Sequence, residues 1–128
     1  MGRVILDTSV VLAAWNTSDH NHSIARKALL EMSDDAVISV VTLSECLVYA
    51  FHENKSILEA AKTKLKNQFQ EIFEIDETIA IEAAQIRSKK KIKIGDALIG
   101  ATSIVHDLEL WTFDKNQSVS VSNARLLK

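Results

Sequence analysis

Short runs of β-branched and other apolar residues recur along the chain, and longer segments with a helical repeat separate them. Apolar runs of this kind, flanked by turn-forming residues, are typical of buried strands. VILD and LELWTFD both end on an acidic residue. The pattern predicts strands at residues 4–7, 36–40, 72–75 and 108–114, and a short fifth strand at 118–121.

The segments between these runs repeat their apolar residues with the period of an α-helix. Ile57, Ala61, Leu65 and Phe69, for example, are each separated by four positions and would share one helix face. The sequence contains no proline that would interrupt such helices. We therefore expect helices at residues 23–32, 42–53, 57–69, 76–89 and 96–106.

The alternation of strands and helices indicates an α/β fold. Right-handed crossovers would give a central parallel sheet of four to five strands with helices on both faces. A chain of 128 residues with 47% hydrophobic content is long enough to bury one core, and we expect a single domain over residues 1–128. In such sheets, ligands bind outside the C-terminal ends of the strands.

Four acidic residues are predicted to lie at that edge. Asp7 ends the first strand and Asp114 ends the fourth. Glu45 is expected in the first turn of the helix that follows the second strand, and Asp96 in the first turn of the helix before the fourth strand. Carboxylates that converge repel one another unless a cation neutralises them. Oxygen ligands favour Mg²⁺ or Mn²⁺, one or two ions of which could activate water against a phosphodiester.

Each acid also has a purely structural interpretation. Thr42 and Glu45 have the spacing of a capping box, and Asp96 could cap its helix. Asp7 could cap the turn that follows it, and Asp114 could form an Asx turn. Caps alone have no reason to fall on one edge of one sheet, so their joint arrangement favours function.

Basic residues are concentrated in one short segment. The net charge is −2, but residues 87–93 contain five cations and no acid, and the rest of the chain has ten basic residues against seventeen acidic ones. Such a segment could hold phosphates, or it could be a solvated helix end whose lysines favour the C-terminal dipole. Its cations are Arg87, Lys89, Lys90, Lys91 and Lys93.

The chain has the features of a cytoplasmic protein. Its single cysteine, Cys46, has no partner for an internal disulfide. Asp7 follows the first apolar run too early for a signal peptide, and no apolar run is long enough to cross a membrane.

Three motifs in order resemble the PIN-domain ribonucleases, and most of all the toxin subunits of VapBC-type toxin–antitoxin modules. They are VILDTSVVLAAW, SVVTLSECLVYA and IKIGDALIGATSIVHDLELWTFD, which together span almost the whole chain. The resemblance implies a three-layer α/β/α domain and Mg²⁺- or Mn²⁺-dependent cleavage of RNA. It further implies a homodimer that an antitoxin inhibits. The helix at 42–53 would suit a dimer interface, with a buried core helix as the equal alternative.

The resemblance also assigns roles to individual residues. Asp7, Glu45, Asp96 and Asp114 match the catalytic acids, with Thr8 or Ser9 orienting the first carboxylate and Thr112 the last. Two departures are present: Asn116 replaces a further acid, and Gln117-Ser118 stands where an aromatic residue is frequent. We expect Asn116 to ligate a metal or hold a water, and we expect the pocket to carry one negative charge less.

These features predict a metal-dependent endoribonuclease of a type II toxin–antitoxin system. Asp7, Asp96 and Asp114 would bind the metal, Glu45 would help position or deprotonate the attacking water, and the basic segment would hold RNA phosphates. Two alternatives remain open. One is a catalytically silent module whose acidic pocket receives a partner's arginine, and the other is a structure-specific DNA nuclease.

Overall fold

The computed structural model describes residues 2–53 and 57–128. Its strands form one five-stranded parallel sheet in the order β3-β2-β1-β4-β5. This confirms the predicted parallel sheet. The strands are β1 (Val4–Leu6), β2 (Ala36–Ser39), β3 (Ile72–Phe73), β4 (Glu109–Thr112) and β5 (Ala124–Leu126).

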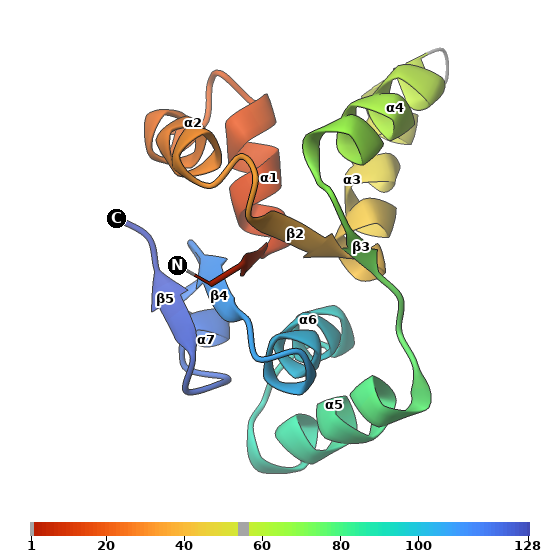
Figure 1. The fold of residues 1–128 in the computed structure, drawn as a ribbon, viewed down its shortest axis with the longest axis vertical. Helices are drawn as coiled ribbons and strands as arrows, with labels where there is room; N and C mark the ends of the chain where they lie inside the picture. The colour runs from red at the N-terminus through yellow and green to blue at the C-terminus, as the bar shows by residue number, and fades with distance from the viewer. Residues whose placement is uncertain (1, 54–56) are drawn as a thin grey trace.

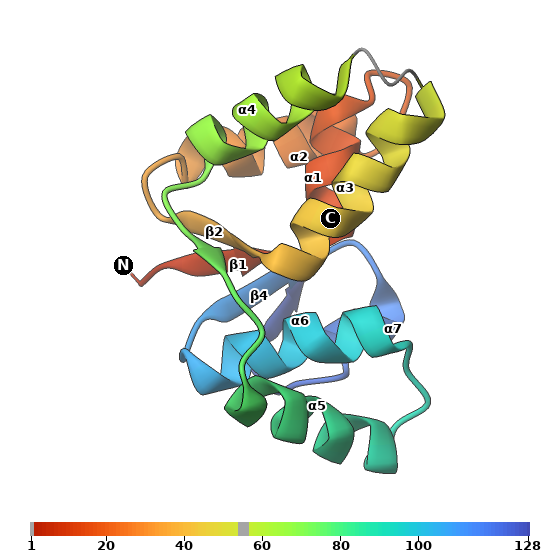
Figure 2. The same ribbon diagram turned by 90° about the vertical axis from the view of Figure 1, so that its right-hand side faces the viewer.

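Helices cover both faces of the sheet, as predicted for a three-layer fold. Helices α1 to α4 lie on one side of the sheet and α5 and α6 on the other, which is clearest in Figure 2 and can be followed from the other direction in Figure 1. The helices are α1 (Thr8–Trp15), α2 (His22–Glu31), α3 (Val40–Glu53), α4 (Leu58–Gln68), α5 (Glu77–Lys89), α6 (Ile94–Val105) and α7 (Lys115–Ser118).

Strand β1 shows why the apolar runs are continuous rather than alternating. Val4 and Leu6 belong to the core beneath α1 and α2, whereas Ile5 belongs to the core beneath α5 and α6. Successive side chains of a strand point to opposite faces, so a strand between two helical layers must be apolar at every position. None of the helices among the described residues combines the length and hydrophobicity needed to span a bilayer.

Three elements, α1, α7 and β5, differ from the predictions. Residues 8–15 form helix α1, for which no separate helix is predicted, because the uninterrupted apolar run gives no helical period there. The predicted strand at 118–121 is wrong: α7 ends at Ser118, and the fifth strand is Ala124–Leu126. The hydroxyl of Ser120 bonds to both the backbone carbonyl and the side-chain oxygen of Gln117, which takes the segment out of an extended conformation.

Candidate functional site

The order of the strands changes direction between β1 and β4. The chain runs outward from β1 to β2 and β3, returns to the far side of β1, and continues from β4 to β5. The crevice at such a switch point, outside the C-terminal strand ends, is where open α/β sheets bind ligands. Asp7 directly follows β1, and Asp114 lies two residues beyond β4. The two acids therefore border the same crevice.

Asp7 is a buried carboxylate held by two hydroxyl groups. Its exposed fraction is only 3%. Its Oδ2 accepts hydrogen bonds from Ser9 Oγ at 2.8 Å and from Thr112 Oγ1 at 2.7 Å. Burial raises the pKa of Asp7 above its usual value, although these two hydrogen bonds act in the opposite direction. The charge of Asp114 raises this pKa further.

The same two hydroxyls also hold the end of β4. Thr112 Oγ1 accepts a hydrogen bond from the backbone N–H of Asp114 at 3.0 Å. Ser9 Oγ accepts one from the backbone N–H of Phe113 at 3.2 Å. Thr112 thus bonds to the carboxylate of Asp7 and only to the backbone of Asp114, whereas the sequence suggested that it orients the carboxylate of Asp114.

Asp114 stabilises a turn and also lies at the candidate site. Its Oδ1 accepts a hydrogen bond from the backbone N–H of Asn116 at 2.8 Å, which is the predicted Asx turn, and it caps α7. Asp114 also lines a cleft together with Asp96, so the turn fixes a carboxylate at the site.

Glu45 reaches the same region from α3. Because α3 begins at Val40, Glu45 lies in its second turn, and the predictions of a first-turn position and of a capping box with Thr42 are wrong. Glu45 Oε1 lies 2.6 Å from Thr8 Oγ1, which in turn lies 3.0 Å from Thr42 Oγ1. The hydroxyl of Thr8 therefore hydrogen-bonds to the carboxylate of Glu45, and that of Ser9 to the carboxylate of Asp7.

Gly95 lies between Glu45 and Asp96. A Cβ atom at Gly95 would lie 3.6 Å from Glu45 Oε2, so the carboxylate packs directly against the start of α6. The sequence placed Asp96 in the first turn of this helix, and this is confirmed, but the capping residue is Lys93 and not Asp96. The Asp96 carboxylate thus has no role as the N-cap of its own helix.

The ionisation of Asp96 shows that the four acids influence one another. Burial and then the charges of Asp7, Asp114 and Glu45 raise the pKa of Asp96 to about 6, and only Lys93 acts to lower it. A cation in the crevice would remove this repulsion. Four acids that are distant in sequence therefore form one electrostatic unit.

The donor set is suited to a hard divalent cation. All four acids offer carboxylate oxygens, and Asn116 adds an amide where it lines the cleft with Asp96 and Asp114. Within residues 2–53 and 57–128, no group of three or more acidic, histidine or cysteine side chains is arranged to hold an ion. The residues thus fit a cation by their chemistry and charge, and ligation would require the carboxylates to draw together.

The cleft has one acidic side and one basic side. It has a volume of about 540 Å³ and lies between the start of α6, the α5–α6 connection and the turn after β4. Arg87 Nε donates to the backbone carbonyl of Ile92 at 3.1 Å, which fixes the basic segment beside the acids. The lining residues are Arg87, Lys91, Ile92, Lys93, Asp96, Asp114 and Asn116.

The structure divides the predicted basic segment into two groups. Arg87, Lys91 and Lys93 line the cleft, whereas Lys89 and Lys90 line a separate depression of about 250 Å³ between α5 and the turn after α7. The ammonium group of Lys90 donates to the backbone carbonyl of Val119. Only three of the five cations are thus placed beside the acids.

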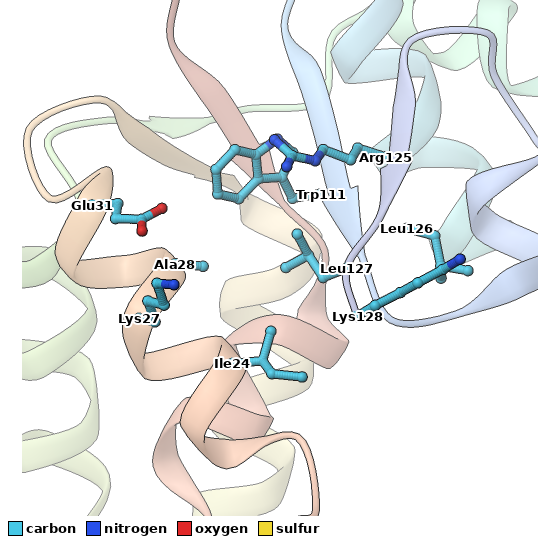
Figure 3. Close-up of a pocket in the computed structure, with 9 residues that line it drawn as sticks. All are labelled: Ile24, Lys27, Ala28, Glu31, Trp111, Arg125, Leu126, Leu127 and Lys128. Atoms are coloured by element: carbon cyan, nitrogen blue, oxygen red, sulfur yellow. The ribbon is translucent and has the colours of Figure 1, made fainter.

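A further cavity lies away from the acids, between α2 and the C-terminal strand. It has a volume of about 470 Å³, and Figure 3 shows Ile24, Lys27 and Glu31 facing it from the helix. On the opposite side, the guanidinium of Arg125 lies over the indole of Trp111, 5.2 Å from the ring centre. None of the four acids lines this cavity.

One residue of the site was not predicted from the sequence. Gln117 is completely buried and donates a hydrogen bond from Nε2 to the backbone carbonyl of Asp96 at 2.9 Å. A glutamine in a short polar stretch gives no local signal of burial, because glutamine is usually exposed. Its partner is 21 residues away in the chain.

Solved structures with the same fold include a toxin–antitoxin complex. A toxin–antitoxin complex from Klebsiella pneumoniae is 24% identical with a TM-score of 0.81, and the match covers 95% of both chains. FitAcB from Neisseria gonorrhoeae is 23% identical, with a TM-score of 0.81 and 96% of both chains covered.

A third similar structure is VapC20 from Mycobacterium tuberculosis, described as a toxin that cleaves the sarcin-ricin loop. It is 17% identical with a TM-score of 0.77, and the match covers 91% of this chain and 94% of that protein. A search of curated proteins gave no match. The sequence profile of the PIN domain matches residues 4–119, which include all four acids and the basic segment. The chain therefore belongs to the PIN domain family.

Proposed function

We propose that this protein is a metal-dependent endoribonuclease. The observation that supports it most is the raised pKa of Asp96, whose carboxylate is repelled by three other acids at the switch point of the sheet. Such a cluster destabilises the folded protein unless a cation binds to it. The neighbouring cations of the cleft would attract a polyanion to the same place.

The residues of the site would have different roles in catalysis. Asp7, Asp96 and Asp114 would ligate one or two Mg²⁺ or Mn²⁺ ions, with Asn116 as a further oxygen donor. Glu45, held by Thr8, would orient the attacking water or accept its proton. The bound metal would supply Lewis-acid stabilisation of the phosphodiester. Arg87, Lys91 and Lys93 would hold the RNA phosphates on the basic side.

The biological role that we infer is that of a toxin in a type II toxin–antitoxin system. The similar structure from Klebsiella is a toxin–antitoxin complex, so an antitoxin is the expected protein partner. Expression of the chain alone in a bacterial host tests this role, and we expect growth to stop.

We also propose a homodimer built on the outer face of α3. Cys46 and Ala50 of this helix are buried in the core, whereas Val48 is 52% and Phe51 49% exposed. Helix α3 therefore has both the buried side and the apolar exposed side that the sequence left as alternatives. Sedimentation of the purified chain as a monomer at micromolar concentration would argue against the dimer.

The first experiment incubates the purified protein with a labelled mixed-sequence RNA in Mn²⁺, in Mg²⁺ or in a chelator. We expect internal cleavage with either metal and none with the chelator, because the acids alone do not activate water. Single-stranded and branched DNA of the same length serve as parallel substrates. Preferential cleavage of the branched DNA would favour the structure-specific DNA nuclease instead.

A silent binding module is the other alternative, and metal binding distinguishes it. Asn116 in the cleft makes the site less acidic than one with a fifth carboxylate, which would suit such a module. The nuclease should bind Mn²⁺ with an affinity that Asp96→Asn lowers strongly. Saturable binding to the wild type that is lost in this variant would exclude the silent module.

The affinity for Mn²⁺ should depend on pH. A metal binds the ionised carboxylate, and the pKa of Asp96 is raised to about 6. We therefore expect full affinity above pH 7 and a decrease of about tenfold for each pH unit below 6, where protons compete with the metal. Calorimetric titrations at pH 5, 6, 7 and 8 measure this dependence. An affinity that is unchanged between pH 5 and 7 would contradict it.

A further inference from the structure

Gln117 is a buried amide whose hydrogen bonds are made to two different parts of the site. It has an exposed fraction of 0%. Its Nε2 donates to the carbonyl oxygen of Asp96 at 2.9 Å, and its Oε1 accepts from Ser120 Oγ at 3.1 Å. A buried amide is costly unless it is hydrogen-bonded at both ends, and these two bonds fix which end faces Asp96.

The backbone of the same residue lies at the other acid. The N–H of Gln117 is 3.5 Å from Asp114 Oδ1, in the turn that caps α7. Gln117 therefore contacts the backbone of Asp96 through its side chain and the carboxylate of Asp114 through its main chain. These are the two acids that line the cleft.

We propose that Gln117 is a positioning residue that sets the separation of Asp96 and Asp114 and thereby the affinity of the cleft for a divalent cation. The inference rests on the proposed function, because it requires that the cleft binds such a cation. Groups that hold ligands in place from outside the coordination sphere typically contribute ten- to a hundredfold to metal affinity.

Loss of the Gln117 amide should change metal affinity more than it changes the stability of the fold. Asp96 lies inside the first turn of α6, where its carbonyl can also accept the bond of the helix itself. Loss of the Gln117 amide therefore leaves this carbonyl with a partner and removes only the link to α7. The helix start and the Asp114 turn would then move independently, which weakens the binding of an ion that requires both carboxylates.

The test compares Gln117→Met with a matched change in the turn before β5. Methionine keeps the length and volume of glutamine but offers no N–H group. Asn123→Leu is the control, because Asn123 Nδ2 donates to the backbone carbonyl of Leu108 at 2.6 Å, away from the acids. Mn²⁺ affinity is measured by calorimetry on the metal-free proteins, and their thermal unfolding is recorded in chelator.

We expect Gln117→Met to weaken Mn²⁺ binding by about tenfold, and Asn123→Leu to leave it within about twofold of the wild type. Equal affinities of Gln117→Met and the wild type would overturn the inference, and so would an equal loss in both variants. A wild type that binds no Mn²⁺ would instead overturn the proposed function on which the inference rests.

Ser120→Ala provides a second variant if Gln117→Met does not fold. It removes the hydroxyl that bonds to Gln117 Oε1 and leaves the contact with Asp96 in place. The amide is then less firmly oriented. We therefore expect Mn²⁺ affinity to fall by about threefold, which is less than the tenfold loss expected for Gln117→Met. An unchanged affinity in Ser120→Ala, with Gln117→Met unfolded, would overturn the inference.

Discussion

Replacement of Asp7 by asparagine is expected to reduce RNA cleavage at least about a hundredfold while the protein becomes more stable without metal. The loss of activity follows because the asparagine amide has no charge to bind the cation, and single electrostatic groups of this kind contribute about a hundred- to a thousandfold to catalysis. The amide oxygen can still accept the hydrogen bonds of Ser9 and Thr112, so the fold should persist.

The gain in stability has a definite pH dependence. The pKa of Asp7 is raised in the folded protein, so the ionised carboxylate destabilises the fold at any pH above that raised value. The benefit of Asp7→Asn should therefore be greatest at neutral and alkaline pH. It should disappear as the pH falls below the ordinary pKa of aspartate, where the carboxyl is protonated in both states. Thermal unfolding in chelator at pH 4 and pH 8 measures the difference.

Asp34→Asn is the matched control for this experiment. Asp34 is exposed and precedes β2, at the edge of the sheet opposite the acids. The same chemical change there should alter neither cleavage nor metal binding. If Asp7→Asn cut RNA as fast as this control, Asp7 would have no part in catalysis.

Replacement of Lys91 by glutamate is expected to weaken RNA binding about tenfold at low salt. Lys91 is exposed and lines the cleft, so the reversed charge would repel the phosphates that approach the acids. The slope of log affinity against log salt should also become shallower by about 0.7, the value for one phosphate contact on a single strand. Binding is measured in chelator, where the RNA stays intact.

Lys89→Glu is the control that the structure supplies for Lys91→Glu. It makes the same charge reversal two residues away, but Lys89 lines the separate depression between α5 and the turn after α7. Its effect on affinity should be below about twofold. Equal losses in the two variants would mean that RNA responds only to the overall charge of the segment, and not to the cleft.

Much of the fold could be predicted from the sequence because it depends on local properties. Hydrophobic period distinguishes strands from helices, and their alternation requires a parallel sheet with helices on both faces. The rule that strand ends meet at one edge was sufficient to group Asp7, Asp114 and Asp96. The Asx turn of Asp114 was likewise predictable, because it involves only neighbouring residues.

The tertiary structure alone decided how the site is assembled. Thr112 bonds to Asp7 across 105 residues and Thr8 to Glu45 across 37, and no local pattern encodes which hydroxyl meets which carboxylate. The basic segment is divided because α5 ends within it. Arg87 and Lys89 lie on the helix about 200° apart around its axis, whereas Lys91 and Lys93 lie in the connection beyond its C-cap, Lys90. The sequence thus determined which residue types gather at one edge of the sheet, and the packing of distant elements determined which of them touch.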